Sequence, residues 1–112
     1  MGAIFRVDEN DLPWSGYKDS ASAASGPVQI RYKALTLNAG GVPPVQYVEY
    51  ARGHADPVHS HKTGEVLVVT HGELWLDDAK SGPGSVVFIP ADTEYSVRGG
   101  EEGVRFFRIV IP

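Results

Sequence analysis

Short apolar segments separated by turn-forming residues constrain the fold of this chain most strongly. No segment keeps the apolar period of a helix, whereas about nine segments have the length and composition of β-strands. Glycine, proline, aspartate and asparagine lie between these segments, a pattern typical of a β-sandwich or β-barrel. We therefore predict an all-β fold. The expected strands are residues 4–7, 29–37, 45–52, a segment around 59–61, 65–70, 73–77, 85–89, 94–98 and 104–111.

The chain length predicts one domain. A chain of 112 residues can bury a single hydrophobic core without disulfides. We expect residues 28–112 to form the β-barrel and residues 1–27 to form an N-terminal arm and a flexible loop. Residues 20–27 are small and polar, which favours a mobile loop or a lid. Trp14 is expected to fix the arm to the domain.

Composition excludes several classes of partner and site. The formal net charge is −4 with no basic cluster, which argues against nucleic acid as a partner. No apolar run approaches the ~20 residues that a membrane-spanning helix needs. There is no cysteine, so disulfides and thiolate metal sites are excluded. The N-terminus lacks the features of a signal peptide, so we predict a cytoplasmic protein.

The segment 29–37 alternates apolar and charged residues. Alternation places Arg31 and Lys33 on one face of this expected strand. Two cations on one face are either solvated or, if that face lines a barrel, able to attract an anionic substrate. The sequence leaves both possibilities open.

Three potential metal ligands lie within residues 53–72. His59 and His61 are two apart, so they share one face of an extended strand, and a turn at 62–64 would return Glu65 beside them. Two imidazoles and one carboxylate suit a divalent transition metal and leave positions open for substrate or oxygen. We interpret His54 and His71, which lie in a glycine-rich loop and beside a turn, as solvated residues.

The spacing of these residues resembles the first motif of the cupin superfamily. The matching positions are Gly53, His59, His61, Glu65 and Gly72. In the second cupin motif Gly84 and Pro90 match, but Asp92 stands where glycine is usual and Tyr95 stands where the fourth metal ligand, a histidine, is expected. The resemblance covers residues 45–111. It implies a small, single-domain, metal-binding cupin with an RmlC-like jelly-roll barrel, a double-stranded β-helix. By the same analogy we expect a homodimer.

Tyr95 is where the chain departs from the cupin pattern, and three roles are open to it. The first role is ligation of the metal as phenolate. The second is a protonated phenol that hydrogen-bonds substrate or a metal-bound water, and the third is an aromatic wall of the cavity. We favour the protonated form because an unperturbed phenol titrates near ~10. The expected catalytic residues are Tyr95 and Glu65, and the expected metal ligands are His59, His61, Glu65 and Tyr95.

These features predict a metal-dependent enzyme that acts on a small oxygenated molecule. The two-histidine, one-carboxylate set favours Fe(II) and a dioxygenase-type reaction, with Mn, Ni, Zn or Co as alternatives. A second interpretation is an isomerase, epimerase or decarboxylase, in which the metal or Tyr95 handles the proton and Glu65 is a base. A third is a non-enzymatic cupin that binds or senses a small molecule, since fold does not establish function.

Overall fold

The structure is a computed structural model, and it describes residues 4–16, 30–36 and 40–111. These residues form eight strands and one 3-10 turn, with no α-helix, so the all-β prediction is confirmed. The elements in chain order are η1 (Glu9–Asp11), β1 (Ser15–Gly16), β2 (Ile30–Ala34), β3 (Val45–Tyr50), β4 (Ala55–His59), β5 (Gly64–Leu76), β6 (Ala79–Ser81), β7 (Val86–Ile89) and β8 (Tyr95–Ile111).

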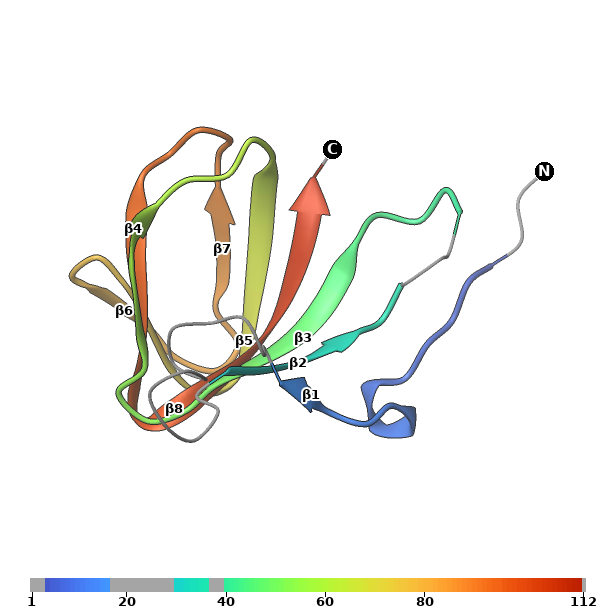
Figure 1. Cartoon of the computed structure of the whole chain (residues 1–112), viewed down its shortest axis with the longest axis horizontal. Helices are drawn as coiled ribbons and strands as arrows, with labels where there is room; N and C mark the ends of the chain where they lie inside the picture. Colours follow the sequence, from blue (N-terminus) through green and yellow to red (C-terminus); the bar gives the residue numbers. More distant parts are fainter. Residues whose placement is uncertain (1–3, 17–29, 37–39, 112) are drawn as a thin grey trace.

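The two longest strands, β5 and β8, hold the barrel together (Figure 1). All pairs are antiparallel, in the order β1-β2-β3-β8-β5-β6, with β4 on β8 and β7 on β5. The second half of β8 pairs with β3 and the first half of β5, and the first half of β8 pairs with β4 and the second half of β5. The sheet therefore folds over itself into two facing layers, the arrangement of the predicted jelly-roll barrel.

Glycines let β5 and β8 pass from one layer to the other. Gly72 and Gly103 both have φ of 73°, a region that side chains resist. A Cβ on Gly72 would lie 2.1 Å from the carbonyl oxygen of Gly103, so the two bends can touch only without a side chain. The predicted strands 65–70, 73–77, 94–98 and 104–111 imply breaks at 71–72 and 99–103, and the turn-forming residues 78–82 predict a turn after 77. Both breaks are wrong because the strands bend and continue, and the expected turn contains β6.

The described part of the N-terminal arm docks on the outside of the barrel. The ring of Trp14 stacks on Tyr47 with 5.5 Å between centroids, which confirms that Trp14 fixes the arm. The expected strand at 4–7 is wrong, since strand pairing begins only with β1, which pairs with β2. Residues 17–27 of the predicted arm and loop lie outside the described residues, so that boundary stays a prediction.

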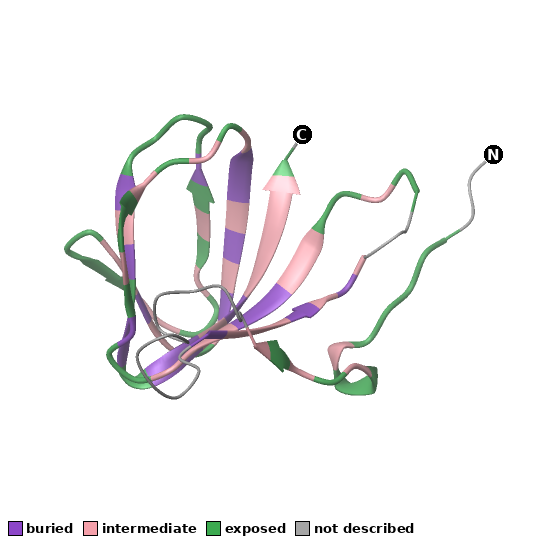
Figure 2. Cartoon of the chain, viewed as in Figure 1, coloured by how far each residue is buried: buried purple, intermediate pink, exposed green. Residues whose placement is uncertain are grey.

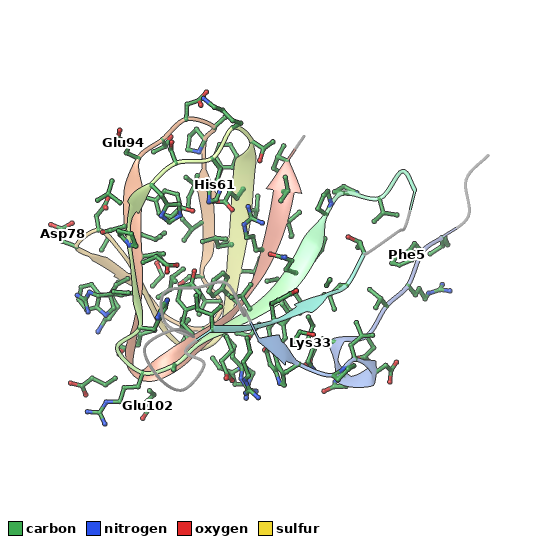
Figure 3. The ribbon with its side chains drawn as sticks, viewed as in Figure 1. Phe5, Lys33, His61, Asp78, Glu94 and Glu102 are labelled. Carbon is green, nitrogen blue, oxygen red and sulfur yellow. The ribbon has the colours of Figure 1, made fainter. Side chains whose placement is uncertain are left out.

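The two cations of β2 face this arm and not the barrel interior. The Arg31 guanidinium is paired with Glu49 at 2.5 Å, and the ammonium group of Lys33 lies 2.8 Å from Glu9. Lys33 is buried under Trp14, 4.8 Å from its ring centroid, on the arm side of β2 in Figure 3. Of the two possibilities that the sequence leaves open, the one in which Arg31 and Lys33 line the barrel and attract an anionic substrate is therefore wrong.

Buried apolar side chains fill the space between the two layers, and Figure 2 shows buried stretches along β3, β5 and β8. Leu74 and Val69 of β5 are 0% and 1% exposed. The described segments contain no helix long and apolar enough to cross a membrane. The core leaves a cavity between the layers, and this cavity carries the candidate site.

Candidate functional site

A cavity of about 370 Å³ lies between the two layers of the barrel. This volume is within the range of small-molecule sites. Its described lining combines an apolar middle with several polar side chains. The lining residues are Ile30, Gln46, Val48, Tyr50, Asp56, His59, His61, Glu65, Leu67, Tyr95, Val97, Phe106 and Arg108.

Glu65 is the most deeply buried polar residue of the cavity, with 1% of its surface exposed. One carboxylate oxygen, Oε1, accepts a hydrogen bond of 2.5 Å from the hydroxyl of Tyr95. The other, Oε2, accepts from Nε of Arg108. The Nη1 group of Arg108 lies 3.4 Å from Oε1 of Gln46, its register partner on β3. Glu65 is thus hydrogen-bonded by two residues of β8 that lie in different layers, Tyr95 at the start of the strand and Arg108 near its end.

Tyr95 opens β8 and faces the cavity, as the cupin motif predicts. Burial raises the pKa of its phenol well above the ordinary value, and the hydrogen bond to Glu65 raises it further. Tyr95 is therefore a protonated donor and not a phenolate. Of the three roles predicted from the sequence, the structure has the protonated form, with Glu65 as the acceptor.

His59 and His61 lie beside Tyr95. An irregularity in the pairing of β4 with β8 turns His59 toward the cavity, opposite Tyr95 in the register. The Nδ1 atom of His59 lies 2.8 Å from the carbonyl oxygen of Pro57. Because a carbonyl only accepts, Nδ1 carries the proton, and in the neutral ring Nε2 is the basic nitrogen.

His61 follows the end of β4, so the two histidines do not share one continuous strand. Their rings still meet edge to face with 5.0 Å between centroids. Figure 3 shows His61 in the upper part of the barrel, between β4 and β5. Its Nε2 lies 3.7 Å from Oε1 of Glu65, too far for a hydrogen bond.

No protein-family model and no curated protein match this sequence. Solved structures do match. An RmlC-like cupin from Ralstonia eutropha superposes with a TM-score of 0.77 at 19% identity, over 96% of this chain and 68% of that chain. The polyketide cyclase RemF from Streptomyces resistomycificus gives 0.77 at 19% identity, over 96% and 79%. A predicted oxalate decarboxylase from Thermotoga maritima gives 0.72 at 14% identity, over 96% and 98%.

The chain has the cupin fold. This confirms the fold that the resemblance of the two motifs implies, and the neighbours include a cyclase and a predicted decarboxylase. At identities below 20% they define the fold of this chain and leave its reaction to be inferred from the site.

The departure at Asp92 from the second cupin motif has a local explanation. Asp92 adopts φ of 61°, the left-handed region in which glycine is usual and aspartate is among the few tolerated side chains. Its backbone N–H donates to the carbonyl oxygen of His61 at 2.8 Å. This contact ties the turn before β8 to the histidine segment and brings Tyr95 beside His59 despite the missing glycine.

The predicted metal-ligand set of this chain is not assembled. Within the described residues, no group of three His, Cys, Asp or Glu side chains is placed to hold a metal ion. The physical reason is that the cation Arg108 is paired with Oε2 of Glu65 and repels a second cation there, while Tyr95 donates to Oε1, the oxygen nearest His61. Tyr95, as a neutral phenol, is a poor ligand. The donor set does not fit Fe(II) or the other divalent ions proposed for His59, His61, Glu65 and Tyr95.

Sequence reasoning missed Arg108 and misread His54. Arg108 lies between apolar residues near the end of β8, on the strand face opposite to Arg105 and on the same face as Phe106, and this was the available signal for a cation facing the cavity. His54 was interpreted as a solvated loop residue, but it is 8% exposed, and its Nε2 lies 3.0 Å from Oδ1 of Asp56. His71 is exposed, as expected, and does not line the main cavity.

Proposed function

We propose that this protein is an enzyme that transfers protons on a small organic acid, in an isomerisation, epimerisation or decarboxylation. One observation supports this most directly: His59 and Arg108 line a single, mainly apolar cavity from its two layers. One bound molecule can therefore contact both His59, a base with a defined tautomer, and the cation Arg108.

Arg108 is the proposed anchor for an anionic group of the substrate. A guanidinium has five N–H donors, and Glu65 and Gln46 are its acceptors among the described residues. Tyr95 also donates to Glu65, so the carboxylate charge is shared between two donors. The remaining N–H groups of Arg108 suit a carboxylate or an enolate oxygen.

His59 is the proposed acid–base residue. The Pro57 carbonyl fixes the proton on Nδ1, so Nε2 can accept a proton from a carbon next to a carbonyl group. The electron pair of the broken C–H bond moves onto the carbonyl oxygen, where the donors of Arg108 stabilise it. Return of the proton to another face or another carbon gives an epimer or an isomer. In a decarboxylation of a 3-oxo acid, the C–C bond to the carboxyl group breaks instead, its electron pair moves onto the carbonyl oxygen as carbon dioxide leaves, and a proton taken up from water at Nε2 of His59 is then given to the carbon.

The Fe(II) dioxygenase predicted from the motif is not part of this proposal. It needs Glu65 as a ligand, and that carboxylate is held by Arg108 and Tyr95. A homodimer and a cytoplasmic location stay with the proposal as predictions from the sequence. The alternative is a non-enzymatic protein that binds a small molecule in this cavity without converting it. A measurement of turnover distinguishes the two.

Hydrogen–deuterium exchange at carbon tests the proposal with a panel of candidate acids. The protein is incubated in D₂O with 2-oxo acids, 3-oxo acids and 2-hydroxy acids, and exchange is followed by ¹H NMR. We expect enzyme-dependent exchange or product for at least one acid. His59→Gln should slow it by ~10²–10⁴-fold, the usual contribution of a general base.

His71→Gln is the matched control, because His71 is exposed and outside the cavity lining. It should keep the parent rate. Arg108→Lys should raise KM because a lysine cannot reproduce the guanidinium geometry. No exchange above the uncatalysed rate for any acid, or exchange that survives His59→Gln, would overturn the proposal.

A further inference from the structure

A second polar group lies in the same cavity, away from Arg108. The Asp56 carboxylate lines the cavity and is held by two neighbours. Its Oδ2 accepts a hydrogen bond of 3.0 Å from the Tyr50 hydroxyl, and its Oδ1 accepts one of 3.0 Å from Nε2 of His54. Buried His54 thus supports Asp56 from behind, since it does not line the cavity itself.

The separation of the two polar groups follows from the strand register. Gln46 of β3 is the register partner of Arg108, and Tyr50, which holds Asp56, lies four residues further along β3. The Cα atoms of Gln46 and Tyr50 are therefore about 13 Å apart. Along β3 and the second half of β8, the cavity residues between these positions are apolar, with Val48 opposite Phe106. The cavity therefore has an Arg108 end and an Asp56 end, with an apolar wall between them on this layer.

We infer that the Asp56 end is a second subsite, which binds a hydroxyl or amino group of the substrate. A carboxylate accepts about four hydrogen bonds, and Tyr50 and His54 supply two. The remaining acceptor capacity matches a hydrogen-bond donor, while a second anionic group would be repelled. The substrate class is therefore a hydroxy acid or an amino acid whose two polar groups are separated by apolar carbons.

This inference rests on the proposed function, because both ends contact the same substrate only if Arg108 binds its anionic group. The second contact fixes the direction in which the substrate lies in the cavity. A substrate with its acid at Arg108 and its donor at Asp56 can bind in only one direction, which presents a defined carbon to His59. A plain fatty acid lacks the second contact.

Isothermal titration calorimetry with linear probes tests the subsite. The probes are hexanoate, 6-hydroxyhexanoate, 6-aminohexanoate and 1,6-hexanediol, with the butanoate and octanoate analogues to bracket the span. In the parent, 6-hydroxyhexanoate or 6-aminohexanoate should bind about tenfold more tightly than hexanoate, as expected for a hydrogen bond to a charged group. The stronger of the two identifies the donor as hydroxyl or ammonium.

Asp56→Asn keeps the shape of the side chain and removes its charge. It should abolish this preference and leave hexanoate binding unchanged, and Asp78→Asn, at an exposed turn, is the matched control. If the melting temperature of Asp56→Asn falls sharply, Tyr50→Phe replaces it and should weaken the preference, because the phenol fixes Oδ2. An equal affinity for hexanoate and its hydroxy and amino analogues in the parent, or a preference that survives Asp56→Asn, overturns the subsite.

Failure of the proposed function gives a different result. In that case hexanoate does not bind or binds independently of Arg108→Lys, while 1,6-hexanediol still binds and loses affinity in Asp56→Asn. That pattern would keep the Asp56 subsite and remove the anion site. Absence of binding by every probe would overturn both.

Discussion

Replacing Tyr95 with phenylalanine removes one of the two donors that hold the buried carboxylate of Glu65. The ring and its packing stay, so the loss is that of one hydrogen bond to a charged acceptor, about 1.5–3 kcal/mol. For a chain of 112 residues, an unfolding entropy of about 2.1 cal/mol/K per residue converts this loss into about 6–13 °C of melting temperature. Urea denaturation followed by tryptophan fluorescence gives the free energy directly.

The pH dependence provides a second readout of Tyr95. Burial raises the pKa of the folded phenol above that of the unfolded chain, near ~10. The stability that Tyr95 contributes is therefore fully present below about pH 10 and is lost as pH rises toward the folded pKa. The difference in unfolding free energy between the parent and Tyr95→Phe should shrink above about pH 10.

Tyr47→Phe is the matched comparison. The Tyr47 hydroxyl lies 2.8 Å from a neutral partner, the hydroxyl of Thr70, so its loss should cost only about 0.5–1.5 kcal/mol. The reasoning is refuted if Tyr95→Phe is no more destabilising than Tyr47→Phe and its effect does not change with pH.

Three further predictions concern the parts that hold this arrangement. Arg108→Leu should cost about 3–5 kcal/mol by leaving Glu65 buried without its cation, and adding Glu65→Leu should restore much of it; a double variant as unstable as the single in urea would contradict this. Trp14→Ala should release the docked arm, seen as faster cleavage of the N-terminal segment in limited proteolysis with the barrel intact. Gly72→Ala should cost at least about 1–3 kcal/mol from its left-handed backbone, whereas Gly82→Ala, which meets no atom within 4 Å, should be nearly neutral in thermal melts.

The fold could be predicted because its signals are local. Turn residues mark where strands end, and the two motifs placed His59, His61, Glu65 and Tyr95 on one cavity, where the structure has them. The glycine-rich bends were misread because a glycine that ends a strand and one that lets a strand cross between layers look alike in sequence. Only the close approach of Gly72 to Gly103 separates the two cases.

The chemistry of the site could not be predicted because it depends on long-range register. Glu65 and Arg108 are 43 residues apart, and their pairing follows from the alignment of β5 with the end of β8. Without that alignment, Glu65 beside two histidines has the composition of a metal ligand. Asp56 was missed for another reason: its partners Tyr50 and His54 are near in sequence, but only the structure shows that Asp56 lines the cavity.

Metal titration of the parent and Glu65→Gln tests the central claim most directly, namely that Glu65 belongs to a protein hydrogen-bond network and not to a metal. Calorimetry with Mn²⁺, Zn²⁺ and, without oxygen, Fe²⁺ should show at most weak binding through the two imidazoles. Glu65→Gln, which keeps one carbonyl oxygen as an acceptor for Arg108 and can donate its amide N–H to the Tyr95 hydroxyl oxygen, should leave that affinity unchanged. One equivalent of tightly bound metal in the parent, lost in Glu65→Gln, would contradict the account and restore the two-histidine, one-carboxylate site.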